Sequence, residues 1–324
     1  MNLPDVSLPT SSLVCYLSVI SYRPALLHRY EWTEPVQVQD RMRKQQAADR
    51  GLRFVDTQGR VLSLQLRVEA PTSAHGSWSL CVYASYWMVN KTGLPLSYKQ
   101  ASRSLTAAGQ PNDIVGMCSP EPLLFSCDDE TLSSVNKCQV KIGNSLWSAP
   151  VVMDVVGMAL AVQVDRADSA GGSEGRASVM AYDLGVDIKY AHGRFSRTKV
   201  ITWVPRIVVV NATDNTVEIS VRVPTTAASE SGVVGGKPTS IAPRSTVPYY
   251  FHGASERNAC LRLSQELFAW GWSAPFRMDE VGTFHAKIHD AESSMVKLVA
   301  VEVAVIGAAF QVGILAALAL PFIH

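Results

Sequence analysis

An excess of charge of either sign is absent from this 324-residue sequence, in which 29 lysines and arginines are balanced by 28 aspartates and glutamates, leaving a formal net charge of +1. Nucleic-acid binding depends on a dominant basic field, so this balance argues against nucleic acid as the partner. Charged residues make up 18% of the chain and hydrophobic residues 47%, which excludes a largely disordered protein. That apolar content is enough for about two ordinary domain cores.

Motifs of enzymes and metal sites are also missing. The six cysteines form no C-x-x-C pair, and no G-x-S-x-G, phosphate-binding glycine loop or catalytic Cys/His motif stands out. His285 and His289 lie in a predicted strand, where a spacing of four residues separates them by about 13 Å, too far to share one metal. We therefore predict a protein that is not an enzyme and has neither cofactor nor metal, with buried thiols in a reducing compartment.

A repeated set of landmarks is the strongest feature that is present. The landmarks are Asn90-Lys-Thr92 with Asn211-Ala-Thr213, Trp147-Ser-Ala-Pro150 with Trp272-Ser-Ala-Pro275, and Met153-Asp-x-Val-Gly157 with Met278-Asp-x-Val-Gly282. Because they occur in the same order at nearly constant spacing, they predict one module present twice. We expect residues 1–78 to be the remnant of a preceding module and a connector, residues 79–205 to form one β module, and residues 206–324 to form a second.

Apolar residues alternate with period two around these landmarks, which predicts an all-β fold built of tandem β-sandwich-like repeats of about 120 residues. The alternating runs are 61–68, 217–223 and 297–306. The N-terminus lacks the basic lead-in of a secretory signal, so the apolar run 13–20 is also predicted to be a strand. A short helix is possible at 38–50, and the polar stretches 166–175 and 224–246 are predicted to be solvated loops.

The stretch Val303–Ile323 contains no charged residue over 21 positions. Its length qualifies it as a transmembrane helix, which would make the chain a membrane-anchored protein. Valines alternate along the chain from Lys297 into this stretch, which favours strands at 296–306 and 310–316. This two-residue period does not match the 3.6-residue period of a helix. The repeat predicts a further module after it, so the chain is expected to be a fragment.

Several segments together resemble the vacuolar protein sorting-associated protein 13 family, in its adaptor-binding domain of the SHORT-ROOT-binding type. These segments are Tyr83–Leu96, Trp203–Thr213, Pro248–His252, Cys260–Leu263, Trp272–Phe276 and Met278–Lys287. The resemblance covers about residues 57–324, and the first 56 residues show no matching landmark. It implies a row of β-sandwich repeats, each with a characteristic asparagine that Asn90 and Asn211 match by position.

The resemblance also implies a function. Members are large cytosolic proteins that bridge organelles at membrane contact sites, where a hydrophobic groove outside this chain moves phospholipids. Their adaptor-binding domain docks short proline-containing motifs of organelle-resident adaptors. The chain would accordingly be a non-catalytic adaptor-binding module, located in the cytoplasm and peripherally at organelle membranes. The alternatives are a purely structural β spacer without its own ligand site, or a protein anchored through residues 303–323.

Each landmark residue has a predicted physical role. Trp147 and Trp272 are expected to fill the cores of their sandwiches, with exposed peptide anchors as the alternative. The amide groups of Asn90 and Asn211 are expected to tie the following loop to neighbouring backbone, and also to fix the edge at which a motif docks. Two pairs remain: Pro150 and Pro275 fit strand ends, and Gly157 and Gly282 fit turns that need a positive φ.

Overall fold

The computed structural model describes residues 14–15, 20–21, 28–29, 36–37, 50–55, 59–69, 79–102, 122–127, 135–157, 159–165, 181–222, 234–251, 258–264, 270–290 and 295–320. Every element in these ranges is a strand except one short 3-10 helix, η1 (Gly193–Phe195). The all-β prediction is thereby confirmed. The cysteines whose side chains are described, Cys81, Cys127, Cys138 and Cys260, form no disulfide.

The N-terminal part contains two short antiparallel pairs and a three-stranded sheet. β1 (Val14–Cys15) pairs with β4 (Val36–Gln37), and β2 (Ile20–Ser21) pairs with β3 (His28–Arg29). Of the possible helix at 38–50, residues 38–49 lie outside the described residues, and Arg50 begins a strand. The sheet is an antiparallel meander of β5 (Arg50–Val55), β6 (Val61–Glu69) and β7 (Ser79–Ala84). Its small core includes Leu62, Leu64 and Leu66, as the alternation predicts.

The next unit is a sandwich of a five-stranded and a three-stranded sheet. The larger sheet has the order β10-β8-β15-β14-β13, and the smaller has the order β12-β11-β9. All neighbours are antiparallel except β8 and β15, which are parallel. The strands are β8 (Tyr86–Asn90), β9 (Leu96–Gln100), β10 (Leu123–Phe125), β11 (Lys137–Ile142), β12 (Val151–Val152), β13 (Ala159–Asp165), β14 (Ala181–Tyr190) and β15 (Lys199–Pro205). Both sheets contribute to one buried core, in which Met88, Tyr98 and Trp203 are fully enclosed.

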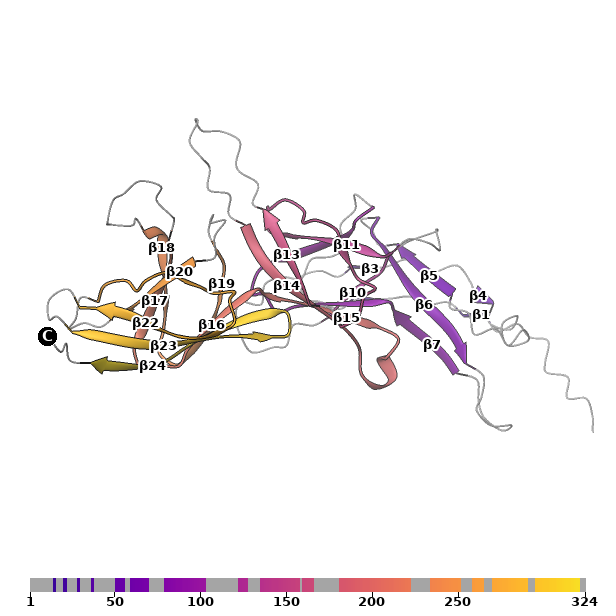
Figure 1. The fold of residues 1–324 in the computed structure, drawn as a ribbon. Helices are drawn as coiled ribbons and strands as arrows, with labels where there is room; N and C mark the ends of the chain where they lie inside the picture. Colours follow the sequence, from indigo (N-terminus) through magenta and orange to yellow (C-terminus); the bar gives the residue numbers. More distant parts are fainter. Residues whose placement is uncertain are drawn as a thin grey trace, which may run out of the picture.

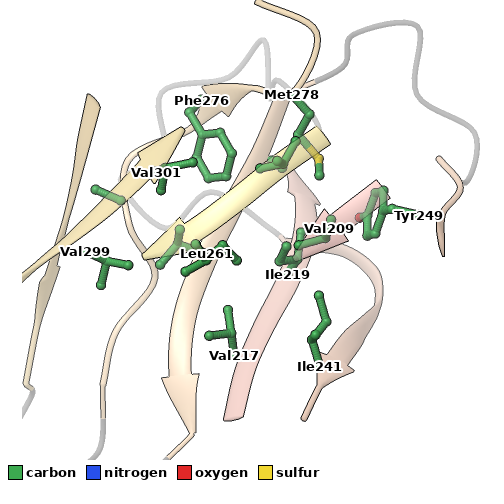
Figure 2. Close-up of a cluster of buried hydrophobic side chains, with 14 of the residues drawn as sticks. Val209, Val217, Ile219, Ile241, Tyr249, Leu261, Phe276, Met278, Val299 and Val301 are labelled. Atoms are coloured by element: carbon green, nitrogen blue, oxygen red, sulfur yellow. The ribbon is translucent and has the colours of Figure 1, made fainter. Parts of the chain in front are cut away.

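A second sandwich repeats this plan. Its sheets have the orders β19-β16-β24-β23-β22 and β18-β17-β20-β21, and β16 runs parallel to β24 as β8 runs parallel to β15. The strands are β16 (Ile207–Asn211), β17 (Thr216–Arg222), β18 (Val234–Ile241), β19 (Ser245–Tyr249), β20 (Asn258–Ser264), β21 (Phe276–Arg277), β22 (Gly282–His289), β23 (Val296–Ile306) and β24 (Ala309–Leu320). Figure 2 shows its core, where Val217, Ile219 and Leu261 lie opposite Val299 and Val301.

The three units are joined by single residues and follow one another along the molecule (Figure 1). Ser85 connects β7 to β8, and Arg206 connects β15 to β16. The same bond recurs at both joints, because Lys199 N–H donates to the Ser85 carbonyl at 3.0 Å and Phe310 N–H donates to the Arg206 carbonyl at 2.8 Å. The meander β5–β7 therefore occupies the place of β13–β15 and β22–β24. On this basis we propose that the first complete module begins at Ser85 rather than at residue 79.

Contacts across the second joint hold the two sandwiches together. Arg206 N–H donates to the Asp183 carbonyl at 3.1 Å, and the Tyr250 hydroxyl donates to the Thr92 carbonyl at 2.6 Å. Tyr250 also packs edge-on against Tyr182, with ring centroids 5.7 Å apart. The modules thus share polar and aromatic contacts as well as a covalent connection.

The apolar stretch near the C-terminus forms strands β23 and β24, as the valine alternation predicts. Val299, Val301 and Val303 are buried, but Val305 is 55% exposed, so the alternation does not extend the core that far. β23 and β24 form a hairpin whose turn lies at the joint between the modules. In the part of the chain that is described, no helix has the length and apolar character needed to cross a bilayer.

One predicted loop is partly wrong. Within 224–246, Val234–Ile241 forms strand β18, which pairs with β17 and places Ile241 fully inside the core. The register shifts between Ile219 and Val221, and a proline-containing strand fits such a bulge at a sheet edge. The glycines and proline that suggested a loop are therefore tolerated because β18 is an edge strand. The other predicted loop, 166–175, lies outside the described residues.

Candidate functional site

Asn90 and Thr92 form a closed hydrogen-bonded knot after β8. Asn90 Nδ2 donates to the Leu94 carbonyl at 2.7 Å, and Asn90 Oδ1 accepts from the Thr92 N–H at 3.0 Å and the Thr92 hydroxyl at 2.7 Å. The Thr92 hydroxyl oxygen in turn accepts from Leu94 N–H at 3.0 Å. Asn90 is 8% exposed and Thr92 is 1% exposed. The short side chains thus supply the partners that a tight turn would otherwise lack.

The second module repeats this knot and enlarges it. Asn211 Oδ1 accepts from the N–H and hydroxyl of Thr213, and Asn211 Nδ2 lies within hydrogen-bonding distance of three carbonyl oxygens. Those carbonyls belong to Asn215 (2.8 Å), Ile241 (3.2 Å) and Ala242 (3.0 Å). Asn211 is completely buried. The knot therefore ties the end of β16 to the end of β18, and the asparagine has no surface with which to touch a partner.

The landmark tryptophans are half-buried, so the prediction that they fill the cores is wrong. Trp147 lies under two ammonium groups, with Lys99 Nζ 4.7 Å and Lys141 Nζ 5.2 Å from the ring centroid. Trp272 lies under the Arg262 guanidinium at 4.7 Å. The residue that turns inward is the neighbouring serine. Among the tryptophans that the structure describes, Trp203 and Trp270 are the buried ones.

The serines of the two Trp-Ser-Ala-Pro segments make the same three hydrogen bonds. Ser148 N–H donates to the Val140 carbonyl, Ser148 Oγ accepts from Val140 N–H at 3.1 Å, and the hydroxyl donates to the Ala149 carbonyl. Ser273 does the same with Leu261 and Ala274. Each segment thereby runs beside its central strand as an extension of the sheet. Sequence reasoning singled out the tryptophan and missed the serine that holds it in place.

The remaining landmarks mark strand ends. Pro150 and Pro275 are exposed and directly precede β12 and β21, as predicted. Gly157 has a φ of +85° in the turn before β13, where a side chain would be strained. Gly282 is the first residue of β22 and does not adopt a positive φ, so the predicted turn role holds only for Gly157.

The two sandwiches differ at one sheet edge. β13 and β22 occupy equivalent edge positions. The residue before the landmark tryptophan caps the end of each strand. Leu146 N–H donates to the Asp165 carbonyl at 2.8 Å, and Gly271 N–H donates to the His289 carbonyl at 2.7 Å. Along β22 the outward side chains include His285 and Lys287. The equivalent positions on β13 are Ala161 and Gln163. The one charged residue of β13, Asp165, lies at the end that Leu146 caps. Charges along an edge strand oppose pairing with another chain, so of these two edges β13 is better suited to accept a strand.

A polar cluster in the first module is centred on Asp154, the acid of the landmark Met153–Gly157, for which sequence reasoning predicted only a turn. Asp154 Oδ1 accepts from the Tyr86 hydroxyl and from Lys199 Nζ, both at 2.7 Å, while Asn136 N–H donates to Asp154 Oδ2 at 2.9 Å. Burial opposes ionisation of Asp154, but the hydrogen bonds from Lys199, Tyr86 and Asn136 outweigh it and lower the pKa of the carboxyl. Burial and the bond to Asp154 raise the pKa of Tyr86. The cluster fixes the start of β8 against β15 and the segment after β12.

The family model of the vacuolar-sorting associated protein 13 adaptor-binding domain matches residues 16–322. The chain belongs to this family. The resemblance drawn from the landmarks is thereby confirmed, and the match reaches into the first 56 residues, where no landmark was found. The family is defined as an adaptor-binding domain. In the ranges that the structure covers, no cluster of three histidine, cysteine or acidic residues is placed to hold a metal ion.

Relatives of this adaptor-binding domain occur in lipid-transfer proteins of animals and fungi. The human intermembrane lipid transfer protein VPS13D is 26% identical over 269 residues, which cover 81% of this chain and 6% of that protein. The VPS13 protein of Chaetomium thermophilum is 28% identical over 259 residues, covering 76% and 7%. Drosophila melanogaster Vps13D is 30% identical over 162 residues, covering 48% and 4%. The chain thus spans a small fraction of the length of these relatives.

Proposed function

We propose that this chain is a non-catalytic module that docks proline-containing linear motifs of organelle-resident adaptors. Such docking would place a bridge-like lipid-transfer protein at organelle contact sites, on the cytoplasmic side and peripherally to the membranes. Phospholipid would be handled by parts of the protein outside this chain. Membership of the adaptor-binding family supports the protein partner, and the names of the relatives support the lipid-transfer context.

The observation that carries the proposal is the edge of β13, which has no charged side chain before Asp165, at the end that Leu146 caps. Ala159, Ala161 and Gln163 face outward along it, while Val162 and Val164 face the core. In the described part of the chain, no strand pairs with the outer side of β13. An extended peptide added there gains backbone hydrogen bonds for affinity, and alternate side chains gain contacts for specificity. Proline is compatible with such a peptide at positions whose N–H would point away from the sheet.

The asparagines act in this proposal as positioning residues. Asn90 and Asn211 bind backbone groups of the surrounding loops and strand ends; Asn211 is completely buried and Asn90 is 8% exposed. Replacing either one lowers stability whether or not the module has a ligand. A test of docking must therefore change exposed positions of the strand edge, which leave the core and the knots intact.

The experiment transplants the side chains of β22 onto β13. The double variant Ala161→His and Gln163→Lys gives the β13 edge the side chains of β22. It should abolish binding of fluorescein-labelled proline-containing adaptor peptides, measured by polarisation, while the melting temperature stays unchanged. The matched control is His285→Ala with Lys287→Gln, which should bind the peptides as the unchanged protein does. Equal binding by the β13 double variant would refute the strand-edge site.

A rigid spacer is the second candidate function, and the joint between the modules favours it. The bonds from Arg206 to Asp183 and from Tyr250 to Thr92 fix the relative orientation of two sandwiches, which is what a spacer requires. A spacer without a ligand site would bind none of the adaptor peptides, in either the unchanged protein or the variants. Peptide binding that is lost only on changing β13 would exclude this second function.

A further inference from the structure

The two modules differ in the charge that surrounds their landmark tryptophans. In the second module, Arg262 covers Trp272 and is itself neutralised by Glu218, with Nε 2.6 Å from the carboxylate. Glu218 lies directly opposite Arg262 in the pairing of β17 with β20. The cation on this tryptophan thus has its own counter-ion within the sheet, and the surface around Trp272 carries no uncompensated charge from this pair.

At the equivalent surface of the first module, the acid is absent and an additional lysine is present. Lys141 takes the place of Arg262, and the residue opposite it in the pairing of β9 with β11 is Ser97 instead of a glutamate. Lys99, on the same strand as Ser97, adds a second ammonium group to the indole of Trp147. Across the described residues, no carboxylate lies within ion-pairing distance of either lysine. Lys137 is exposed on the same face of β11 and adds a third positive charge.

Trp147, Lys99 and Lys141, which we call the Trp147 platform, therefore combine a half-buried indole with two uncompensated charges. Ammonium groups held over one ring repel each other, and an anion placed beside them relieves that repulsion. The indole offers an apolar surface that a carboxylate alone does not use. The combination matches a peptide segment in which an acidic side chain adjoins an apolar one, and it matches an isolated phosphate less well.

We propose that the Trp147 platform binds an acidic linear segment of a partner protein. A glutamate or aspartate of the segment would be held by Lys99 and Lys141, and a neighbouring apolar side chain would pack on Trp147. In the second module, Glu218 supplies the carboxylate that pairs with Arg262. The equivalent residue of the first module is the shorter, uncharged Ser97, which leaves room for a carboxylate from the partner. This site uses the outer face of the small sheet, so it is independent of the strand edge at β13.

The test compares the full chain with variants that exchange the charge patterns of the two modules. The probe is a fluorescein-labelled peptide in which glutamates alternate with leucines and which contains no proline, followed by polarisation. Ser97→Glu installs the acid of the second module opposite Lys141 and should weaken binding about fivefold. Glu218→Ser exposes Arg262 beside Trp272 and should strengthen binding by creating a second site. Raising the salt to about 0.5 M should reduce binding in every case.

The controls separate a specific site from general electrostatic attraction. Lys287→Glu removes an exposed lysine of the second module and should leave probe affinity unchanged. A peptide with glutamine at every glutamate should bind about tenfold more weakly than the probe. The double variant Lys99→Glu and Lys141→Glu, with melting temperature checked, should lose the probe.

Three results would overturn the proposal. The first is equal probe binding by the unchanged protein and the Lys99/Lys141 double variant. The second is loss of binding in Lys287→Glu to the same degree as in Ser97→Glu. The third is binding to phosphatidylcholine vesicles that contain phosphatidylserine, sensitive to Lys99 and Lys141, with no binding of the glutamate peptide, which would make the platform a lipid-headgroup site.

Discussion

Replacing Gly185 with alanine tests whether the two sandwiches form one rigid unit. Gly185 lies on β14 of the first module, where the turn between β23 and β24 of the second module approaches it. A Cβ atom on Gly185 would overlap the Ala308 carbonyl oxygen and approach Val204 Cγ2 to 2.9 Å. Backbone lies on one side of this contact, so the overlap cannot be relieved by rotating a side chain. The turn at Ala308 must move away.

That movement has a calculable cost. The Ala308 carbonyl accepts a hydrogen bond from Arg206 Nη1 at 2.7 Å, and the Arg206 guanidinium also lies 4.6 Å from the centre of the Phe310 ring. A hydrogen bond from a charged group contributes about 1.5–3 kcal/mol, and overpacking a tight contact costs about 1–3 kcal/mol. We expect Gly185→Ala to destabilise the joint by about 2–4 kcal/mol, which corresponds to a fall in melting temperature of roughly 5–10 °C.

Differential scanning calorimetry and small-angle X-ray scattering measure the two consequences. The variant should melt at lower temperature, with the transitions of the modules separated, and it should sample a wider range of molecular lengths. Gly282→Ala is the matched control, because a Cβ at Gly282 meets nothing within 4 Å and its φ is not positive. If Gly185→Ala melts within about 1 °C of the unchanged protein while both profiles stay identical, the rigid joint is refuted.

Three further predictions concern stability. Asn211→Ala leaves three carbonyls near β16 and β18 without their donor and should cost about 3–5 kcal/mol in chemical denaturation, more than any exposed substitution on β22. Trp203→Ala should cost about 3–5 kcal/mol because it empties the core, whereas Trp147→Ala should cost about 1–2 kcal/mol, and equal losses would contradict their different burial. The pKa of Asp154 is lower in the folded than in the unfolded state. The ionised carboxylate therefore contributes fully to the free energy of unfolding above the unfolded pKa of about 3.9, and this contribution is lost as the pH falls through the lower folded pKa. Asp154→Asn should therefore lower the melting temperature at pH 7 and flatten its fall in acid; an unchanged acid profile would show that the cluster is not the titrating element.

Strand positions were predictable because alternation records burial directly. Leu62, Leu64 and Leu66 are buried as a set, and so are Val217, Ile219 and Val221. β18 was missed because its glycines and proline are typical of a loop. It is an edge strand that is stabilised by pairing with β17. Phe195 ends the 3-10 helix η1 and packs against Trp87, 5.2 Å away between ring centroids. Local composition could not reveal either pairing.

Burial of the tryptophans was mispredicted for a geometric reason. In Trp-Ser-Ala-Pro the serine hydroxyl bonds the backbone of the central strand, so Ser148 and Ser273 are 3% and 5% exposed. Successive side chains on an extended segment point to opposite sides, and the tryptophan next to each serine is therefore turned outward. Size and hydrophobicity suggest the opposite arrangement. Only the hydrogen bonds of the serine decide which neighbour is inside.

The comparison of the two modules separates what the fold requires from what each surface can recognise. Buried polar bonds are repeated nearly atom for atom in the asparagine knots and in the Trp-Ser segments, because an unmet donor or acceptor in a core is costly wherever it occurs. Outward positions are free of that constraint. There the first module has Ser97 where the second has Glu218, and Gln163 where the second has Lys287. A row of such modules can therefore keep one folding plan while each copy presents its own combination of edge and charge. Selectivity for different adaptors would then depend on these exposed substitutions, and the shared asparagines would set only the framework on which they act.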